Sequence, residues 1–119
     1  RGKIKLENNI QRGNYGEIKM DIYFEEQGYK RISIDKVTNL NAPIHKGLDG
    51  VYYNQDGQPS YIIGEAKYGR SKLIKTRDGV QMSDDWIRGS NRLVNSVGKN
   101  IAKEILKSGY DKMVITIDK

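Results

Sequence analysis

The stretch from Gly47 to Tyr68, GLDGVYYNQDGQPSYIIGEAKY, decides the fold. Its two flanks, residues 48–53 and 60–68, are rich in branched and aromatic residues and predict the arms of a β-hairpin. The intervening residues 54–59, NQDGQP, are dense in turn formers, so we expect the chain to reverse direction there. The middle of the chain is therefore predicted to be a pair of antiparallel strands.

A site shared by the charged residues of this hairpin would require a particular register between its arms. Asp49 lies on the first arm, and Glu65 and Lys67 lie on the second, where their i, i+2 spacing puts them on one face. A two-residue turn at Asp56-Gly57 would place Asp49 opposite Gly64 and turn Glu65 to the other face. A site shared by the two acids therefore requires an odd loop or a bulge, with the carboxylates about 4–5 Å apart.

Outside the hairpin, periodicity and turn residues predict the remaining elements. They are a helix at 9–26, a strand at 29–37, a loop at 38–47, a basic and mobile loop at 69–79, helices at 81–108 and a strand at 111–118. Ser83 is expected to cap the later helices, and Gly98 to divide them. The predicted order is helix, three strands, helix or helices, strand, in a single α+β domain.

Length and composition limit the functions that this chain can have. The chain has 119 residues, which is the size of one domain, and 21 Lys and Arg against 15 Asp and Glu give a formal net charge of +6. This charge favours anionic partners such as nucleic acid, anionic lipid or an acidic protein, although a merely soluble basic domain has the same balance. No apolar run approaches the ~20 residues that span a bilayer, and no signal-peptide pattern is present.

The chain has no cysteine and one histidine, His45. These counts remove disulfides, thiolate zinc sites, cysteine nucleophiles and any mechanism that needs two imidazoles. A metal ion would have to be held mainly by oxygen ligands. We interpret His45 as an ordinary loop residue, with approach to a substrate or metal as the alternative.

Asp49, Glu65 and Lys67, together with Glu17 on the first predicted helix, suit metal-assisted hydrolysis of a phosphodiester. Carboxylates on adjacent strands can hold a hard divalent cation, which polarises the phosphate and lowers the pKa of a bound water. The lysine can orient that water and offset the developing negative charge. The alternatives are a solvated ion pair between Glu65 and Lys67, a turn-forming Asp49 and an exposed Glu17. Asp21, one turn after Glu17, is expected to stay outside the site.

This pattern resembles the PD-(D/E)xK nucleases. Asp49 is followed by fifteen residues and then by Glu65-x-Lys67, behind a helix that bears Glu17. The resemblance covers nearly the whole chain and implies a restriction-endonuclease-like core of a helix, three antiparallel strands, helices and a strand. It implies Glu17, Asp49, Glu65 and Lys67 as catalytic residues, with the three acids holding Mg²⁺ or Mn²⁺, or alternatively Zn²⁺. The family's proline before the aspartate is absent, because Leu48 occupies that position.

A basic segment follows the predicted second arm of the hairpin. The residues expected to bind nucleic acid are Arg70, Lys72, Lys75, Arg77 and Gln81. A solvated loop would have the same composition. The family resemblance favours DNA as the substrate. The alternatives are an RNase toxin of the same fold that cleaves tRNA, a non-catalytic basic nucleic-acid-binding module, and a basic domain that binds an acidic protein.

Two segments have a narrower resemblance. GEAKYG at 64–69 and QMSDDWI at 81–87 resemble C-terminal toxin domains of bacterial contact-dependent growth inhibition and related polymorphic toxin systems. That resemblance implies a nuclease secreted or displayed as part of a larger protein, which the start at Arg1 rather than Met also suggests. It further implies action in the cytoplasm of a target bacterium and a cognate immunity protein as partner, with a monomer before that partner binds.

Overall fold

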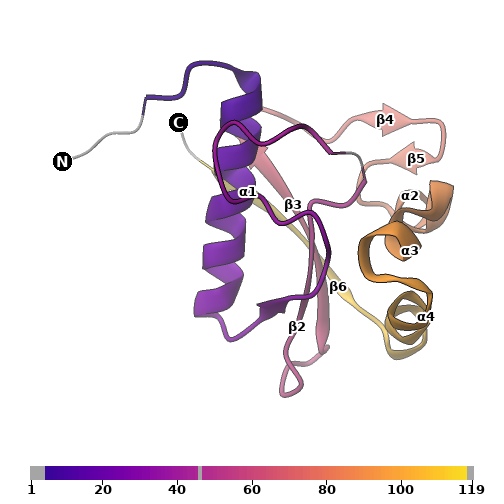
Figure 1. Ribbon diagram of the computed structural model, residues 1–119. Coiled ribbons are helices and arrows are strands. Elements are labelled where there is room, and N and C mark those ends of the chain that lie inside the picture. Colours follow the sequence, from indigo (N-terminus) through magenta and orange to yellow (C-terminus); the bar gives the residue numbers. More distant parts are fainter. Residues whose placement is uncertain (1–4, 46, 118–119) are drawn as a thin grey trace.

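A four-stranded mixed sheet forms the centre of the computed structural model, which describes residues 5–45 and 47–117. The helices are α1 (Asn9–Glu26), α2 (Asp84–Arg88), α3 (Arg92–Val97) and α4 (Lys99–Ser108), and the strands are β1 (Lys30–Arg31), β2 (Gly50–Tyr53), β3 (Tyr61–Tyr68), β4 (Lys75–Thr76), β5 (Gly79–Val80) and β6 (Asp111–Ile117). Helix α1 covers one face of the sheet and α2 to α4 cover the other (Figure 1). The domain is thus an α+β structure in three layers.

The sheet has the order β1-β2-β3-β6. The first three strands pair antiparallel, and β6 returns parallel to β3 after the chain has crossed over through α2, α3 and α4. A parallel return of this kind needs a long connection, which the three short helices provide. The predicted order of helix, three antiparallel strands, helices and strand is confirmed.

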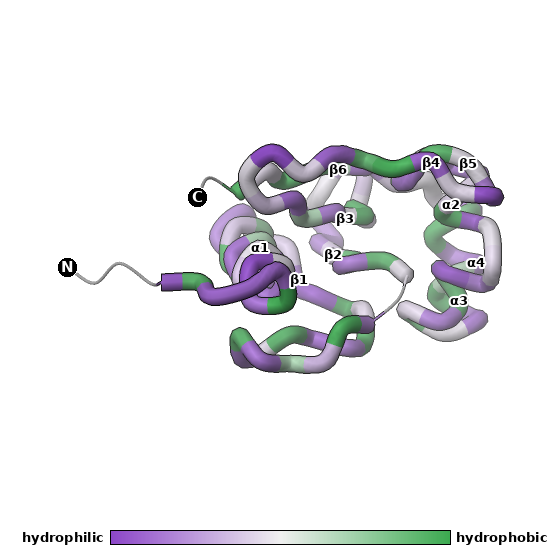
Figure 2. Tube along the Cα trace, turned by 90° about the horizontal axis from the view of Figure 1, so that it is seen from above, coloured by the Kyte–Doolittle hydropathy of each residue, from purple (hydrophilic) through white to green (hydrophobic). Residues whose placement is uncertain are grey.

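The two faces of the sheet bury two separate apolar clusters, and Figure 2 shows the sheet from above, between α1 and the later helices. Met20 and Phe24 of α1 pack on Tyr52 and Ile62. The cluster on the opposite face contains Val51, Ile63, Trp86, Ile87, Leu93 and Ile105 among others. Strand β3 is therefore buried on both faces over its first five residues. A charged side chain in it is costly unless something neutralises that charge.

The register of the central hairpin allows its acids to share a face. Gly50 pairs with Gly64, and Tyr53 pairs with Tyr61. One more step along the same register places Asp49 opposite Glu65, on the face that carries Val51. The loop at 54–60 contains an odd number of residues, so the prediction of an odd loop is confirmed and the register of a two-residue turn is not found.

The strand predicted at 29–37 is much shorter in the structure, because β1 contains Lys30 and Arg31 alone. Beyond it, the Ser33 hydroxyl accepts the Val51 N–H at 2.9 Å, a bond that a backbone carbonyl would make in a continuing strand. The Ile34 N–H then donates to the Ser96 carbonyl at 2.9 Å. The chain therefore leaves the sheet and crosses to α3.

The basic segment predicted as a mobile loop contains the small β4–β5 hairpin. The Thr76 hydroxyl donates to the Gly79 carbonyl at 2.7 Å and closes its turn. The helix expected from Gln81 begins three residues later, where Ser83 accepts the Trp86 N–H as the predicted cap. A 3₁₀ turn at Gly89–Asn91 adds a second break to the one at Gly98. No helix in the described ranges is both long and apolar enough to cross a bilayer.

Candidate active site

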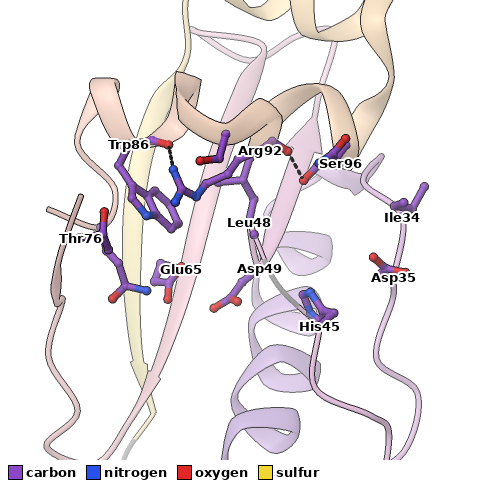
Figure 3. Close-up of a pocket in the computed structure, with 14 residues that line it drawn as sticks. Ile34, Asp35, His45, Leu48, Asp49, Glu65, Thr76, Trp86, Arg92 and Ser96 are labelled. Carbon is purple, nitrogen blue, oxygen red and sulfur yellow. Dashed lines mark hydrogen bonds between the residues drawn. The ribbon is translucent and has the colours of Figure 1, made fainter. Parts of the chain in front are cut away.

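Two of the predicted acids, Asp49 and Glu65, line a cavity of about 630 Å³ (Figure 3). Asp49 and Glu65 form its floor on the sheet, His45 comes from the loop before β2, and Gln81 comes from the segment after β5. The wall opposite is formed by α2, α3 and the segment that holds Ile34. The cavity therefore gathers side chains that are far apart in the sequence.

Glu65 is a buried carboxylate in the central strand, with 4% of its surface exposed. Its Oε1 has no hydrogen-bond partner within the described residues, and its Oε2 lies 3.5 Å from the Lys67 Nζ. Burial raises the pKa of Glu65 above its usual range, and the positive charge of Lys67 opposes that rise. An unsatisfied buried carboxylate oxygen is a feature that a bound cation would explain.

Asp49 lies directly before β2 and points toward β3. Its Oδ2 accepts the Ala66 N–H at 2.9 Å, so the side chain satisfies a donor of the central strand. Burial raises the pKa of Asp49 well above its usual range, and the negative charges of Glu65 and Glu17 raise it further. The three acids therefore repel one another, and a cation placed among them would relieve that repulsion.

Glu17 reaches this cluster from α1, and it pairs with His45. The His45 Nε2 lies 2.8 Å from the Glu17 Oε1, and this hydrogen bond raises the pKa of His45 to about 9. Ligand atoms of Glu17, His45 and Asp49 all lie within 4.8 Å of one another. This position beside two predicted acids favours the alternative in which His45 approaches a metal ion. Its signal in the sequence was its position four residues before Asp49.

The set of potential metal ligands differs in one member from the predicted set of Glu17, Asp49 and Glu65. His45 belongs to the group within 4.8 Å, and Glu65 does not. Glu65 is held one strand away from Asp49, with its Oε2 directed toward Lys67. Glu65 nevertheless lines the same cavity as Asp49 and His45. The structure therefore places all the predicted acids around one site, with an imidazole added.

Lys67 is held between Glu65 and Gln81. Its ammonium donates to the Gln81 Oε1 at 3.0 Å, and the same oxygen accepts the Ile74 N–H at 3.0 Å. Gln81 was predicted to contact nucleic acid, and in the structure its carbonyl oxygen fixes the lysine and the start of the β4–β5 hairpin. The side chain of Gln81 also lines the cavity, where it can meet a ligand.

The four predicted basic residues do not line the cavity. Arg70, Lys72, Lys75 and Arg77 are all exposed, on the segment after β3 and on the β4–β5 hairpin. The basic residue in the wall is Arg92. Its guanidinium donates to Asp78 and to the Trp86 carbonyl, and it stacks 4.5 Å from the centre of the Trp86 ring. Arg92 therefore fastens the β4–β5 turn to α2.

A second hydrogen-bond network, centred on Arg31, holds the backbone of Asp49. Arg31 donates to the Asp49 backbone carbonyl at 3.1 Å and to the Asp21 carboxylate at 2.9 Å. Asp21 also accepts the Tyr52 hydroxyl at 2.5 Å and the Lys36 ammonium at 3.3 Å. Because these donors occupy its carboxylate, Asp21 stays outside the site, as predicted. Arg31 links the α1 face of the sheet to Asp49.

No protein-family model, curated protein or solved structure matches this chain. The resemblance to nucleases and toxin domains therefore stays a prediction from sequence, and a function has to be argued from the site itself.

We expect Glu65→Gln to stabilise the metal-free protein by about 1 kcal/mol, as substitutions at functional sites often do. The pKa of Glu65 is raised by folding above its ordinary value of 4.5, so stability falls as pH rises past that value, and an amide avoids this loss. Urea unfolding in EDTA at neutral pH measures the gain, which should shrink toward pH 4. Glu7→Gln, at an exposed position, is the matched control. A less stable Glu65→Gln protein at neutral pH would contradict the prediction.

Proposed function

We propose that this chain is a metal-dependent endonuclease that hydrolyses phosphodiester bonds, with DNA as its preferred substrate, on a restriction-endonuclease-like core. One observation carries the proposal. The buried Glu65 has an unpartnered Oε1 within the described residues, and it lies beside Asp49 on the sheet and 3.5 Å from Lys67. Carboxylates and a lysine grouped in this way on a buried strand have an energetic cost, which a catalytic role would explain.

The residues fit a divalent cation. Asp49 and Glu65 supply carboxylate oxygens to one cavity, and Glu17 and His45 bring an oxygen and a nitrogen within 4.8 Å of the Asp49 carboxylate. Burial raises the pKa values of Asp49 and Glu65, neighbouring acids raise them further, and a bound cation would stabilise the charged forms. These four residues would hold the ion. When bound, a divalent cation polarises the phosphate and lowers the pKa of a water molecule.

Lys67 would act on the reacting groups. Its ammonium has three donor protons, and hydrogen-bond or ion-pair partners are present at Glu65 and Gln81. The third proton is available to a water molecule or to a phosphate oxygen in the cavity. A charge fixed by two neighbours stabilises developing negative charge without having to reorganise. The i, i+2 spacing of Glu65 and Lys67 is what delivers both groups to the same side.

The exposed basic residues would bind the nucleic-acid backbone. Arg70, Lys72, Lys75 and Arg77 lie on the segment that borders the cavity through Thr76 and Gln81. Contacts between such residues and phosphates give affinity that falls with salt. The hairpin that carries two of them is tied to α2 by Arg92 and Asp78, so these charges would be presented from a fixed surface.

We also propose that this nuclease acts as a toxin, delivered within a larger protein and neutralised by a cognate immunity protein. This proposal rests on the resemblance of residues 64–69 and 81–87 to toxin domains. Neither the cavity nor the basic surface distinguishes a target bacterium's DNA from its tRNA, so the tRNA-cleaving alternative is decided by the assay below.

The test is incubation of the purified chain with supercoiled plasmid and, separately, with tRNA. Each reaction contains Mg²⁺, Mn²⁺ or Zn²⁺, and a parallel reaction contains EDTA. We expect metal-dependent plasmid cleavage that EDTA abolishes. Cleavage of tRNA alone would move the substrate to RNA, and salt-sensitive binding without cleavage under any of these metals would refute the enzyme and leave a binding module.

A further inference from the structure

We propose that His45 is a direct metal ligand and that it makes this site selective for Zn²⁺ over Mg²⁺. The inference rests on the proposed function, because it concerns the metal of the same site. It goes beyond that function by adding a nitrogen ligand and by committing to the kind of ion. A site of carboxylates alone would suit Mg²⁺ or Mn²⁺ instead.

The geometry of three side chains carries the inference. One ligand atom from each of Glu17, His45 and Asp49 lies within 4.8 Å of the other two. Zinc binds histidine nitrogen and carboxylate oxygen at about 2.0–2.2 Å, so atoms on opposite sides of one ion are separated by about 4 Å. The three atoms are thus close enough to reach a common ion after small side-chain movements.

A second observation points to the same place. The Oε1 of Glu65 is buried and lacks a partner within the described ranges, and Glu65 lines the cavity that Asp49 and His45 also line. In the view of Figure 3, Asp49 lies between Glu65 and His45. A cation next to Asp49 would therefore lie among the ligand atoms of Glu17, His45 and Asp49. It would also lie near the Glu65 Oε1, which has no other partner within the described residues.

The alternative is that His45 serves as an ion-pair partner of Glu17 and nothing more. That pair leaves the buried Glu65 Oε1 without a partner within the described residues, and it does not explain why a ligand atom of Asp49 lies within 4.8 Å of both Glu17 and His45. A divalent ion shared by all four side chains compensates them together. Imidazole binds Zn²⁺ well and is a poor ligand for Mg²⁺, whose ligands are oxygens, so a coordinating His45 changes which ion the site prefers.

The sequence makes this inference unusually easy to test. His45 is the sole histidine of the chain, and there is no cysteine. A ¹⁵N-labelled chain prepared without a histidine tag therefore shows one imidazole in a long-range ¹H–¹⁵N spectrum. Any metal-induced change of a ring nitrogen is then assigned to His45 without further work.

The experiment titrates the chelator-treated chain with Zn²⁺ and, separately, with Mg²⁺. We expect Zn²⁺ to shift one ring nitrogen of His45 strongly, and Mg²⁺ to leave both unshifted. In calorimetry, Zn²⁺ should bind at least about 100-fold more tightly than Mg²⁺. His45→Gln should weaken Zn²⁺ binding by at least about 10–100-fold, the loss seen when mere supporting partners of metal ligands are removed. Asp56→Asn, an exposed acid in the hairpin loop, should change neither affinity.

Zn²⁺ binding that leaves the His45 ring unshifted would overturn the inference, as would an unchanged ratio of Zn²⁺ to Mg²⁺ affinity in His45→Gln. The spectrum of the natural chain needs no variant, so a folding defect in His45→Gln does not affect it. A shifted ring with no cleavage of plasmid or tRNA would support this metal site and refute the nuclease. Plasmid cleavage with an unshifted ring would support the nuclease and refute His45 as a metal ligand.

Discussion

Replacing Lys67 by alanine should lower the rate of metal-dependent cleavage by about 10²–10³-fold, the loss typical of removing one fixed donor from a reacting centre. The Lys67 ammonium lies 3.5 Å from Glu65 and 3.0 Å from the Gln81 carbonyl, so it is held by two residues that line the cavity. Its removal also takes away the charge that opposes the rise in the pKa of Glu65. Single-turnover cleavage of plasmid at saturating metal measures the effect.

The matched control is Lys72→Ala, which removes the same charge from an exposed position on the basic segment. We expect it to weaken binding in a salt-dependent way and to leave the single-turnover rate at saturating protein within about threefold, because backbone phosphate contacts contribute affinity rather than chemistry. If Lys67→Ala cleaves as fast as the natural chain, the assignment of the active site is wrong.

The second large effect concerns stability. Replacing Arg31 by alanine should destabilise the protein by about 3–5 kcal/mol, because breaking a buried ion pair leaves its partner charge uncompensated. The side chains of Arg31 and Asp21 are 7% and 8% exposed, and Arg31 also donates to the carbonyls of Ser33, Ile34 and Asp49. Urea unfolding in EDTA measures the loss without a contribution from bound metal.

Arg88→Ala is the control for this change. Arg88 forms an ion pair with Asp85 at 3.3 Å, but these side chains are 50% and 85% exposed. An exposed pair contributes at most about 1 kcal/mol, so the control should cost far less than Arg31→Ala. Equal losses of unfolding free energy in the two variants would show that burial does not determine how much the Arg31 ion pair contributes to stability.

Local patterns were enough to predict much of the fold. The helix at 9–26 has the predicted bounds, and both arms of the hairpin are where their composition placed them. Alternation failed at 29–37, because Ile34 fits the period of a strand but is 59% exposed and bonds to Ser96. The carbonyl of Ser96 in α3, distant in the sequence, binds this segment, and no period within the segment encodes such a partner.

The candidate site, like the fold, could be predicted only in part. The positions of Glu65 and Lys67 follow from their spacing on one strand, and that of Asp49 follows once the hairpin loop is odd. The contacts of His45 with Glu17 and of Arg31 with Asp49 were not predicted, because they join residues 28 and 18 positions apart. His45 lies in the irregular segment before β2, which has no periodicity from which to predict a direction, and Arg31 lies in β1, a strand of two residues that is too short to show one.

The candidate ligands come from opposite layers of the molecule. Glu17 belongs to the helix that packs on one face of the sheet, while Glu65 shares the other face with the cluster beneath α2 to α4. No single supersecondary unit carries all the candidate ligands. A chain that is unfolded during delivery, as in passage through a narrow pore, would therefore lack the metal site. Metal capture would come last, after both layers have closed, and would act as a latch on the completed fold, because an ion that binds the native state alone adds to its stability.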